Sequence, residues 1–143
     1  MTAKKTTFPT AQDAEAAFYE ALESNDFGAM MEVWADDEEI VCIHPNGERL
    51  VGYRQVRDSW AAIFRSGQRI KVHLTDPVQM SGMMFAVHGV NENVMVHGEP
   101  QARAPVAATN IYLRTGNGWR MIVHHASAVL PPQSLTEFPK VLH

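Results

Sequence analysis

The chain has a single cysteine, Cys42, among its 143 residues, so no internal disulfide can form. Its neighbours Ile40, Val41 and Ile43 indicate a buried, unreactive thiol in a strand. A nucleophilic thiol would instead need an electropositive and partly exposed setting. The cysteine and histidine spacings of zinc sites are also missing, and we expect neither a metal nor another cofactor.

Long apolar runs are equally scarce, and none approaches the ~18 residues that a membrane-spanning helix requires. Residues 1–9 contain two lysines but not the apolar segment of a secretion signal. The sequence therefore predicts a cytoplasmic protein that has no membrane partner.

Clusters of positive charge are missing as well. The formal net charge is −4, and Lys4-Lys5 is the only adjacent basic pair. A nucleic-acid binder needs a basic patch to neutralise phosphates, so we expect no nucleic-acid partner.

What the chain does have is ordinary globular composition, with 45% hydrophobic and 20% charged residues. Its length fits one domain with a sizeable core. We expect a flexible leader at 1–9, a single domain at 10–130 and a C-terminal tail at 131–143.

Helical periodicity is confined to the first half of the chain. Thr10 is a good N-cap for a first helix, and Asp26 for a second that follows at once. A third helix is expected between Gly52 and Gly67, where glycine is a common helix C-cap. Its inward residues are predicted to be Val56, Trp60, Ile63 and Phe64.

From residue 68 onward the apolar period changes to two, which indicates strands. Asp76-Pro77 predicts a bulge or bend, because proline cannot donate to a strand ladder. Helices followed by long antiparallel strands favour an α+β fold. The expected strands are 40–43, 49–51, a strand from residue 70, 85–96, 106–114 and 119–129, the last two joined by the turn 115–118.

This order of elements, together with several motifs, resembles the nuclear transport factor 2-like superfamily, and within it the SnoaL-like and ketosteroid-isomerase-like proteins. The resemblance covers roughly residues 10 to 130. It implies a cone-shaped, strongly bent antiparallel sheet that encloses a pocket with the three N-terminal helices, a cystatin-like α+β barrel. The motifs are the helix hairpin at 21–27 and 31–37, the runs 43–47 and 52–56, and the final hairpin 109–112 with 118–125.

The resemblance also implies a site. Ketosteroid isomerases of this fold use an aspartate base before a proline, where this chain has His44. A protonated aspartic acid on the penultimate strand corresponds to Asn110. Their oxyanion tyrosine on the first helix corresponds to Phe18, with Tyr19 one residue away. The missing tyrosine argues against steroid isomerisation.

The residues themselves allow an acid–base site. His44 would be a competent base at neutral pH, and the Asn110 amide could donate to an oxyanion. Two alternatives stay open: His44 could be a turn residue bonded to the backbone, and Asn110 could be satisfied within the sheet. The residues expected around the pocket, several of which could equally be core, are Phe18, Met30, Trp34, Trp60, Phe64, Tyr112, Val123 and His125.

Adjacent residues of a strand face opposite sides, so His124 and His125 cannot share one metal ion. Alternation with Trp119, Met121 and Val123 predicts that His125 faces the pocket and His124 the outer face. A metal held by His44, His88 and His125 is disfavoured, because no short-range pair of ligands is present. Glu92 is either a pocket carboxylate or a solvated bulge residue, and we favour the bulge.

Two functions fit this reading. The first is a pocket protein of unassigned activity that binds a small apolar metabolite. The second is an isomerase, cyclase or lyase that acts on a carbonyl compound, with His44 as base and Asn110 as oxyanion donor. In either case we expect a homodimer that forms through the outer sheet face, where Ile122 and Val129 could supply an apolar patch.

Overall fold

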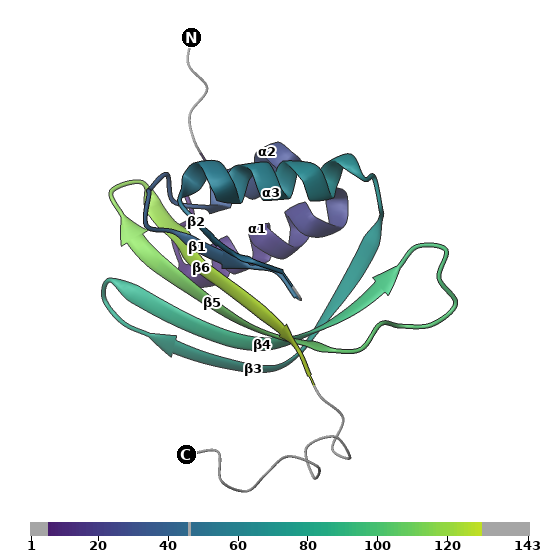
Figure 1. Cartoon of the computed structure of the whole chain (residues 1–143). Helices are drawn as coiled ribbons and strands as arrows, with labels where there is room; N and C mark the ends of the chain where they lie inside the picture. Colours follow the sequence, from purple (N-terminus) through teal and green to yellow (C-terminus); the bar gives the residue numbers. More distant parts are fainter. Residues whose placement is uncertain (1–5, 46, 130–143) are drawn as a thin grey trace, which may run out of the picture.

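The computed structural model describes residues 6–45 and 47–129. The helices lie together on one side of a curved sheet (Figure 1). The expected tail at 131–143 lies outside the described residues. In chain order the elements are α1 (Ala11–Ser24), α2 (Phe27–Val33), β1 (Val41–Ile43), β2 (Arg49–Val51), α3 (Tyr53–Arg65), β3 (Ile70–Ser81), β4 (Phe85–Val96), β5 (Val106–Thr115) and β6 (Gly118–Ala128).

The six strands form one sheet in the order β2-β1-β6-β5-β4-β3. All neighbours are antiparallel except β1 and β6, which run parallel and pair Cys42 with His124. The sequence predicted antiparallel strands throughout, because it gives no sign of which distant strand β1 adopts as its neighbour. Since β2 and β3 are the two ends of the order, the described sheet is open and curves around the helices (Figure 1).

The predicted N-caps are confirmed, whereas the C-cap of α3 is Ser66, one residue before the predicted Gly67. The Thr10 side chain accepts a hydrogen bond from the Asp13 amide, and Asp26 accepts one from the Ala29 amide. These caps fix where α1 and α2 begin. Gly67, just beyond the end of α3, has φ 71°, a left-handed conformation that glycine adopts without a Cβ penalty.

Two bulges interrupt the long strands. The predicted one is confirmed: the β3–β4 register shifts between Thr75 and Val78, and Asp76 has φ 55°. The other lies in β6, where Ile111 pairs with Val123 but Tyr112 pairs with Met121. Ile122 is therefore an extra residue, and it reverses which side chains of β6 face the helices.

The core fills the space between the helices and the concave face of the sheet. Its largest fully buried side chains include Phe18, Met30, Tyr112 and Met121. Phe8, which the sequence placed in a flexible leader, is also buried, and its ring lies 5.1 Å from the Arg120 guanidinium. No helix among the described residues is long and apolar enough to cross a membrane.

Candidate functional site

A cavity of about 260 Å³ opens between α3 and the sheet. Most of its exposed wall is apolar, and the ionisable side chains in it are His44, Glu92, His124 and Arg103. The other lining residues are Leu22, Asn25, Pro45, Trp60, Ile63, Phe64, Ser66, Gln68, Ile70, Val94 and Val96.

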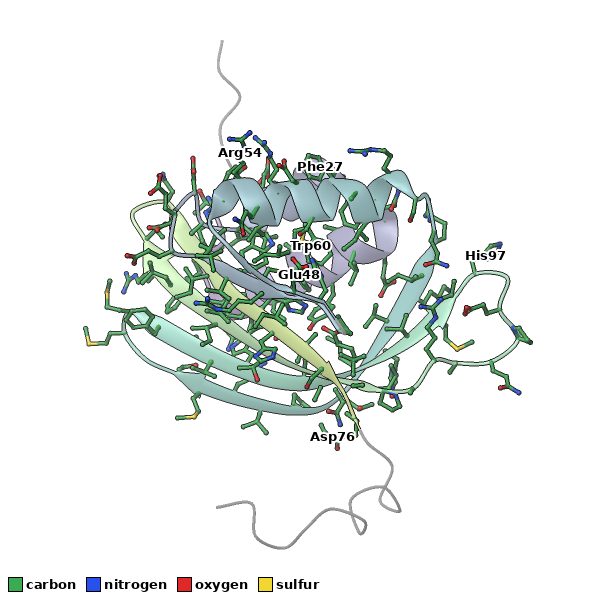
Figure 2. The ribbon with its side chains drawn as sticks, in the orientation of Figure 1. Phe27, Glu48, Arg54, Trp60, Asp76 and His97 are labelled. Atoms are coloured by element: carbon green, nitrogen blue, oxygen red, sulfur yellow. The ribbon has the colours of Figure 1, made fainter. Side chains whose placement is uncertain are left out.

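Trp60 is the central aromatic residue of this wall. It projects from α3 into the space above the sheet (Figure 2) and is 3% exposed. Its ring meets His44 edge to face, with centroids 4.7 Å apart, and lies 6.2 Å from the ring of His124. The Trp60 indole therefore packs beside both imidazoles of the cavity.

Of the residues that the sequence placed around a pocket, the structure brings His44, Trp60 and Phe64 together in this wall. Ile63, expected to face inward, lines the cavity but is 39% exposed. Phe18, Met30, Trp34 and Tyr112 are buried in the core instead, and Trp34 borders a different hollow beside Arg120.

The orientation predicted for the two adjacent histidines is wrong. His124 is 3% exposed and lines the cavity, whereas His125 is exposed. Val123 is half-buried and does not line the cavity. The reason is the extra residue Ile122, which inverts the alternation that was counted from Trp119.

Four buried side chains form a continuous hydrogen-bond chain behind the cavity. Tyr19 Oη donates to Glu92 Oε2 at 2.6 Å and accepts from Asn110 Nδ2 at 3.0 Å. Asn110 Oδ1 in turn lies 2.6 Å from His124 Nδ1. Asn110 itself is fully buried and outside the cavity lining, so it is linked to the cavity only through its neighbours, directly to His124 and by way of Tyr19 to Glu92.

Burial changes the proton affinities of these groups. It raises the pKa of the Glu92 carboxyl, although the hydrogen bond from Tyr19 acts in the opposite direction. Burial, with His44 and His125 nearby, lowers the pKa of His124 to about 3. Burial also lowers the pKa of His44, so both imidazoles of the cavity are neutral at pH 7.

His44 is held from the side of α3. Its Nε2 lies 3.1 Å from Ser59 Oγ, and that hydroxyl donates to the Val56 carbonyl at 2.8 Å. Cys42 Sγ lies 3.6 Å from the same nitrogen. The cysteine is buried, as the sequence predicted, and burial raises its pKa to about 12.

A further buried histidine, His88, lies outside the cavity lining. Its Nδ1 is 3.0 Å from Glu15 Oε2, and its ring lies 5.0 Å from that of Tyr112. Within residues 6–45 and 47–129, no three histidine, cysteine or acidic side chains are grouped closely enough to hold a metal ion.

Sequence reasoning missed Tyr19 and misjudged Glu92 as a solvated bulge residue. Both are buried, and they bond to each other across 73 positions of sequence. One signal was available: Val90 and Glu92 share a face of β4, and Val90 is a typical inward residue.

The sequence model of the SnoaL-like domain matches residues 12–131, most of the chain. The chain belongs to the SnoaL-like family. A suggested dehydratase of the NTF2-like family from Streptomyces avermitilis is 35% identical, over 82% of this chain and 92% of that one, with a TM-score of 0.75. Cystatin-like folds are also among the similar solved structures, which confirms the predicted fold.

Other relatives of this SnoaL-like chain carry different names. A suggested calcium/calmodulin-dependent protein kinase type II association domain from Thiobacillus denitrificans is 35% identical, covers 87% of this chain and 99% of its own, and has a TM-score of 0.77. F-box protein SKIP8 from Arabidopsis thaliana is 26% identical over 79% of this chain and 47% of the relative. This chain spans about half the length of that curated relative.

Proposed function

We propose that this SnoaL-like chain binds a small, neutral and mostly apolar organic molecule in the cavity beneath α3. The observation that carries the proposal is the composition of the wall, where Trp60, Phe64, Ile70 and Val94 surround a few polar groups. Ligand pockets have this composition, with apolar walls for affinity and a few polar groups for orientation.

The size and charge of the cavity support a small neutral ligand. A volume of about 260 Å³ lies just below the usual range of ligand sites, roughly 300–1,000 Å³, and so suits a small molecule of one or two rings. Arg103, a cation in the wall, is already paired with Glu99 at 3.0 Å. An anionic ligand would therefore lose its hydration without gaining a free counter-ion.

Binding can be tested by filling the cavity. Tryptophan fluorescence and calorimetry would measure the affinity of the full-length protein for a panel of one- and two-ring compounds. Ile70→Trp places an indole in the cavity wall and should abolish binding, whereas Lys71→Trp, on the exposed side of the same strand, should leave it intact. Absence of binding to wild-type protein across the panel would refute the proposal.

A second candidate is a lyase that removes water from a hydroxy-carbonyl compound, favoured by the two neutral imidazoles in one aromatic cavity. One imidazole would take the proton α to the carbonyl, the C–H electrons would form the new double bond, and the hydroxyl would leave as water after protonation. Glu92, whose pKa burial raises, is the best proton donor among the cavity groups. The 35% identity to a suggested dehydratase points in the same direction.

The geometry gives no support to Asn110 as an oxyanion donor. Its Nδ2 donates to Tyr19, and the residue does not line the cavity. Dehydration is testable with 4-hydroxy-4-phenylbutan-2-one, which yields a conjugated enone that absorbs in the ultraviolet. Wild-type protein should accelerate enone formation by about 100-fold or more, and His44→Ala should lose this while His73→Ala does not. No acceleration would reject the lyase and leave the binding proposal standing.

A further inference from the structure

The tautomer of His124 is fixed by its neighbour. Asn110 presents its carbonyl oxygen Oδ1 to His124 Nδ1 at 2.6 Å, and an oxygen of this kind can only accept. Nδ1 must therefore carry the proton of the neutral imidazole. The other nitrogen, Nε2, is left with a lone pair in a side chain that lines the cavity.

The orientation of Asn110 follows from the residues behind it. Tyr19 has one hydroxyl proton and gives it to Glu92, so its oxygen is free to accept from Asn110 Nδ2. The amide nitrogen thus points to Tyr19 and the amide oxygen to His124. Every donor in the chain points the same way, from His124 toward the carboxylate of Glu92.

His44 is fixed in the opposite tautomer by the same logic. Ser59 donates its only hydroxyl proton to the Val56 carbonyl, so Ser59 Oγ accepts from His44 Nε2. His44 Nε2 therefore carries the proton, and Nδ1 has the lone pair. In each imidazole the nitrogen that the protein does not use is an acceptor.

The two imidazoles of the wall consequently each offer one acceptor nitrogen, on His44 and on His124, while Arg103, the cation of the wall, is paired with Glu99. The indole N–H of Trp60 has no accessible surface, so it is not offered to the cavity. We propose that the ligand of this site is a neutral alcohol, phenol or amine whose O–H or N–H donates to His124 Nε2 or His44 Nδ1. This inference rests on the proposed binding function and names the ligand class of the same cavity.

Four compounds that share a naphthalene ring can separate the ligand classes. 2-Naphthol is a neutral donor, 2-fluoronaphthalene is close in size but has no O–H, 2-naphthaldehyde offers only an acceptor, and 2-naphthoate is an anion. Calorimetry on the full-length protein at pH 7 should give an affinity for 2-naphthol at least about ten-fold higher than for the other three. His124→Phe and His44→Phe each keep a ring but remove a lone pair, and at least one of them should reduce this preference to less than about three-fold, while His125→Phe should leave it unchanged.

Nitrogen NMR of the ¹⁵N-labelled wild-type protein tests the tautomers without any ligand. His124 should show a protonated Nδ1 and an unprotonated Nε2, and His44 the reverse. Addition of 2-naphthol should move the signal of an unprotonated nitrogen on His124 or His44 towards that of a hydrogen-bonded acceptor. This measurement and the wild-type affinity ranking still decide the question if His124→Phe does not fold.

The outcomes distinguish failure of the binding function from failure of the inference about the ligand class. Equal affinity for all four compounds, tighter binding of the aldehyde, or a proton on His124 Nε2 would overturn the donor-ligand inference and leave the binding function in place. If none of the compounds binds, the binding function fails, and the inference fails with it.

Discussion

The hydroxyl of Tyr19 on α1 donates a 2.6 Å hydrogen bond to the carboxylate of Glu92 on β4, with both side chains buried. This contact joins α1 to β4, the strand next to the edge strand β3. It also starts the chain of hydrogen bonds that ends at His124 in the cavity wall. A buried carboxylate is tolerated here because the hydroxyl satisfies it.

Tyr19→Phe should therefore destabilise the protein. The change leaves the ring in place but removes one partner of Glu92 and one of Asn110, and unpaired buried groups cost about 1–3 kcal/mol. Urea unfolding would measure the loss. Tyr53→Phe is the matched control, because the Tyr53 hydroxyl bonds to none of the described residues and its removal should cost less than about 0.5 kcal/mol. Equal effects of the two changes would contradict the role given to Tyr19.

Acid should destabilise the fold through His124. Its pKa is about 3 in the folded chain and 6.5 as a free side chain, so the unfolded state binds more protons between these values. Stability then rises with pH across this window and falls as the solution is acidified below pH 6.5. Between pH 6.5 and 5 the loss from one such histidine is about 2 kcal/mol.

Unfolding of His124→Gln at pH 7 and pH 5 would measure this contribution, since the variant should lose less stability on acidification than the wild type. His125→Gln changes the exposed neighbour and should behave as the wild type does. A wild-type stability that is the same at both pH values would contradict a neutral, buried His124.

Glu92 should affect the pH dependence of stability in the opposite direction to His124. Its pKa in the folded chain lies above the ordinary value of 4.5, so between these two values the folded state holds a proton that the unfolded state has lost. Stability attributable to Glu92 therefore falls as pH rises above 4.5 toward the raised pKa. Glu92→Gln should gain stability relative to the wild type between pH 5 and 8, measured by thermal unfolding. Glu20→Gln, at an exposed site on α1, should show no such trend.

His44→Ala should leave folding nearly intact. His44 is only partly buried, and its hydrogen bond to Ser59 contributes about 1 kcal/mol. Chemical unfolding of the variant would measure the change against His73→Ala, an exposed site on β3. A loss of several kcal/mol would mean that the imidazole is structural rather than part of a binding site.

We propose that two copies of the chain associate through the outer sheet face, at a patch other than the one expected. Ile122 packs against the core and Val129 is 40% exposed, whereas Val78 and Met80 are 64% and 68% exposed. These two face away from the helices, because Gln79 between them contacts Gln12 on α1. Sedimentation velocity should show a dimer that Met80→Lys dissociates and Gln68→Lys does not. A monomeric wild type would contradict the proposal.

The fold was predictable because its signals are local. Thr10 and Asp26 cap helices by bonding to amides three residues further along the chain. The dipeptide Asp76-Pro77 lies at the bulge that it predicts. The parallel pairing of β1 with β6 was not predictable, since Cys42 and His124 are neighbours only through the tertiary fold.

The candidate site was predictable only in part. His44, Trp60 and Phe64 come from the turn after β1 and from α3, where helical spacing reports the inward face. Glu92 has polar neighbours on both sides in sequence, and its partner Tyr19 lies on another element, so the face it shares with Val90 is the one local sign of its burial. The bulge at Ile122 contains neither glycine nor proline, and nothing in the sequence of β6 signals it.

That inserted position affects how functions are transferred between relatives. Two homologues can share the dipeptide His-His in the same alignment column and still turn different imidazoles inward, if one of them lacks the added residue upstream. Deletion of Ile122 would reproduce this exchange within one chain. Assigning roles in this family therefore requires the strand register of each member and not the identity of the aligned residue alone.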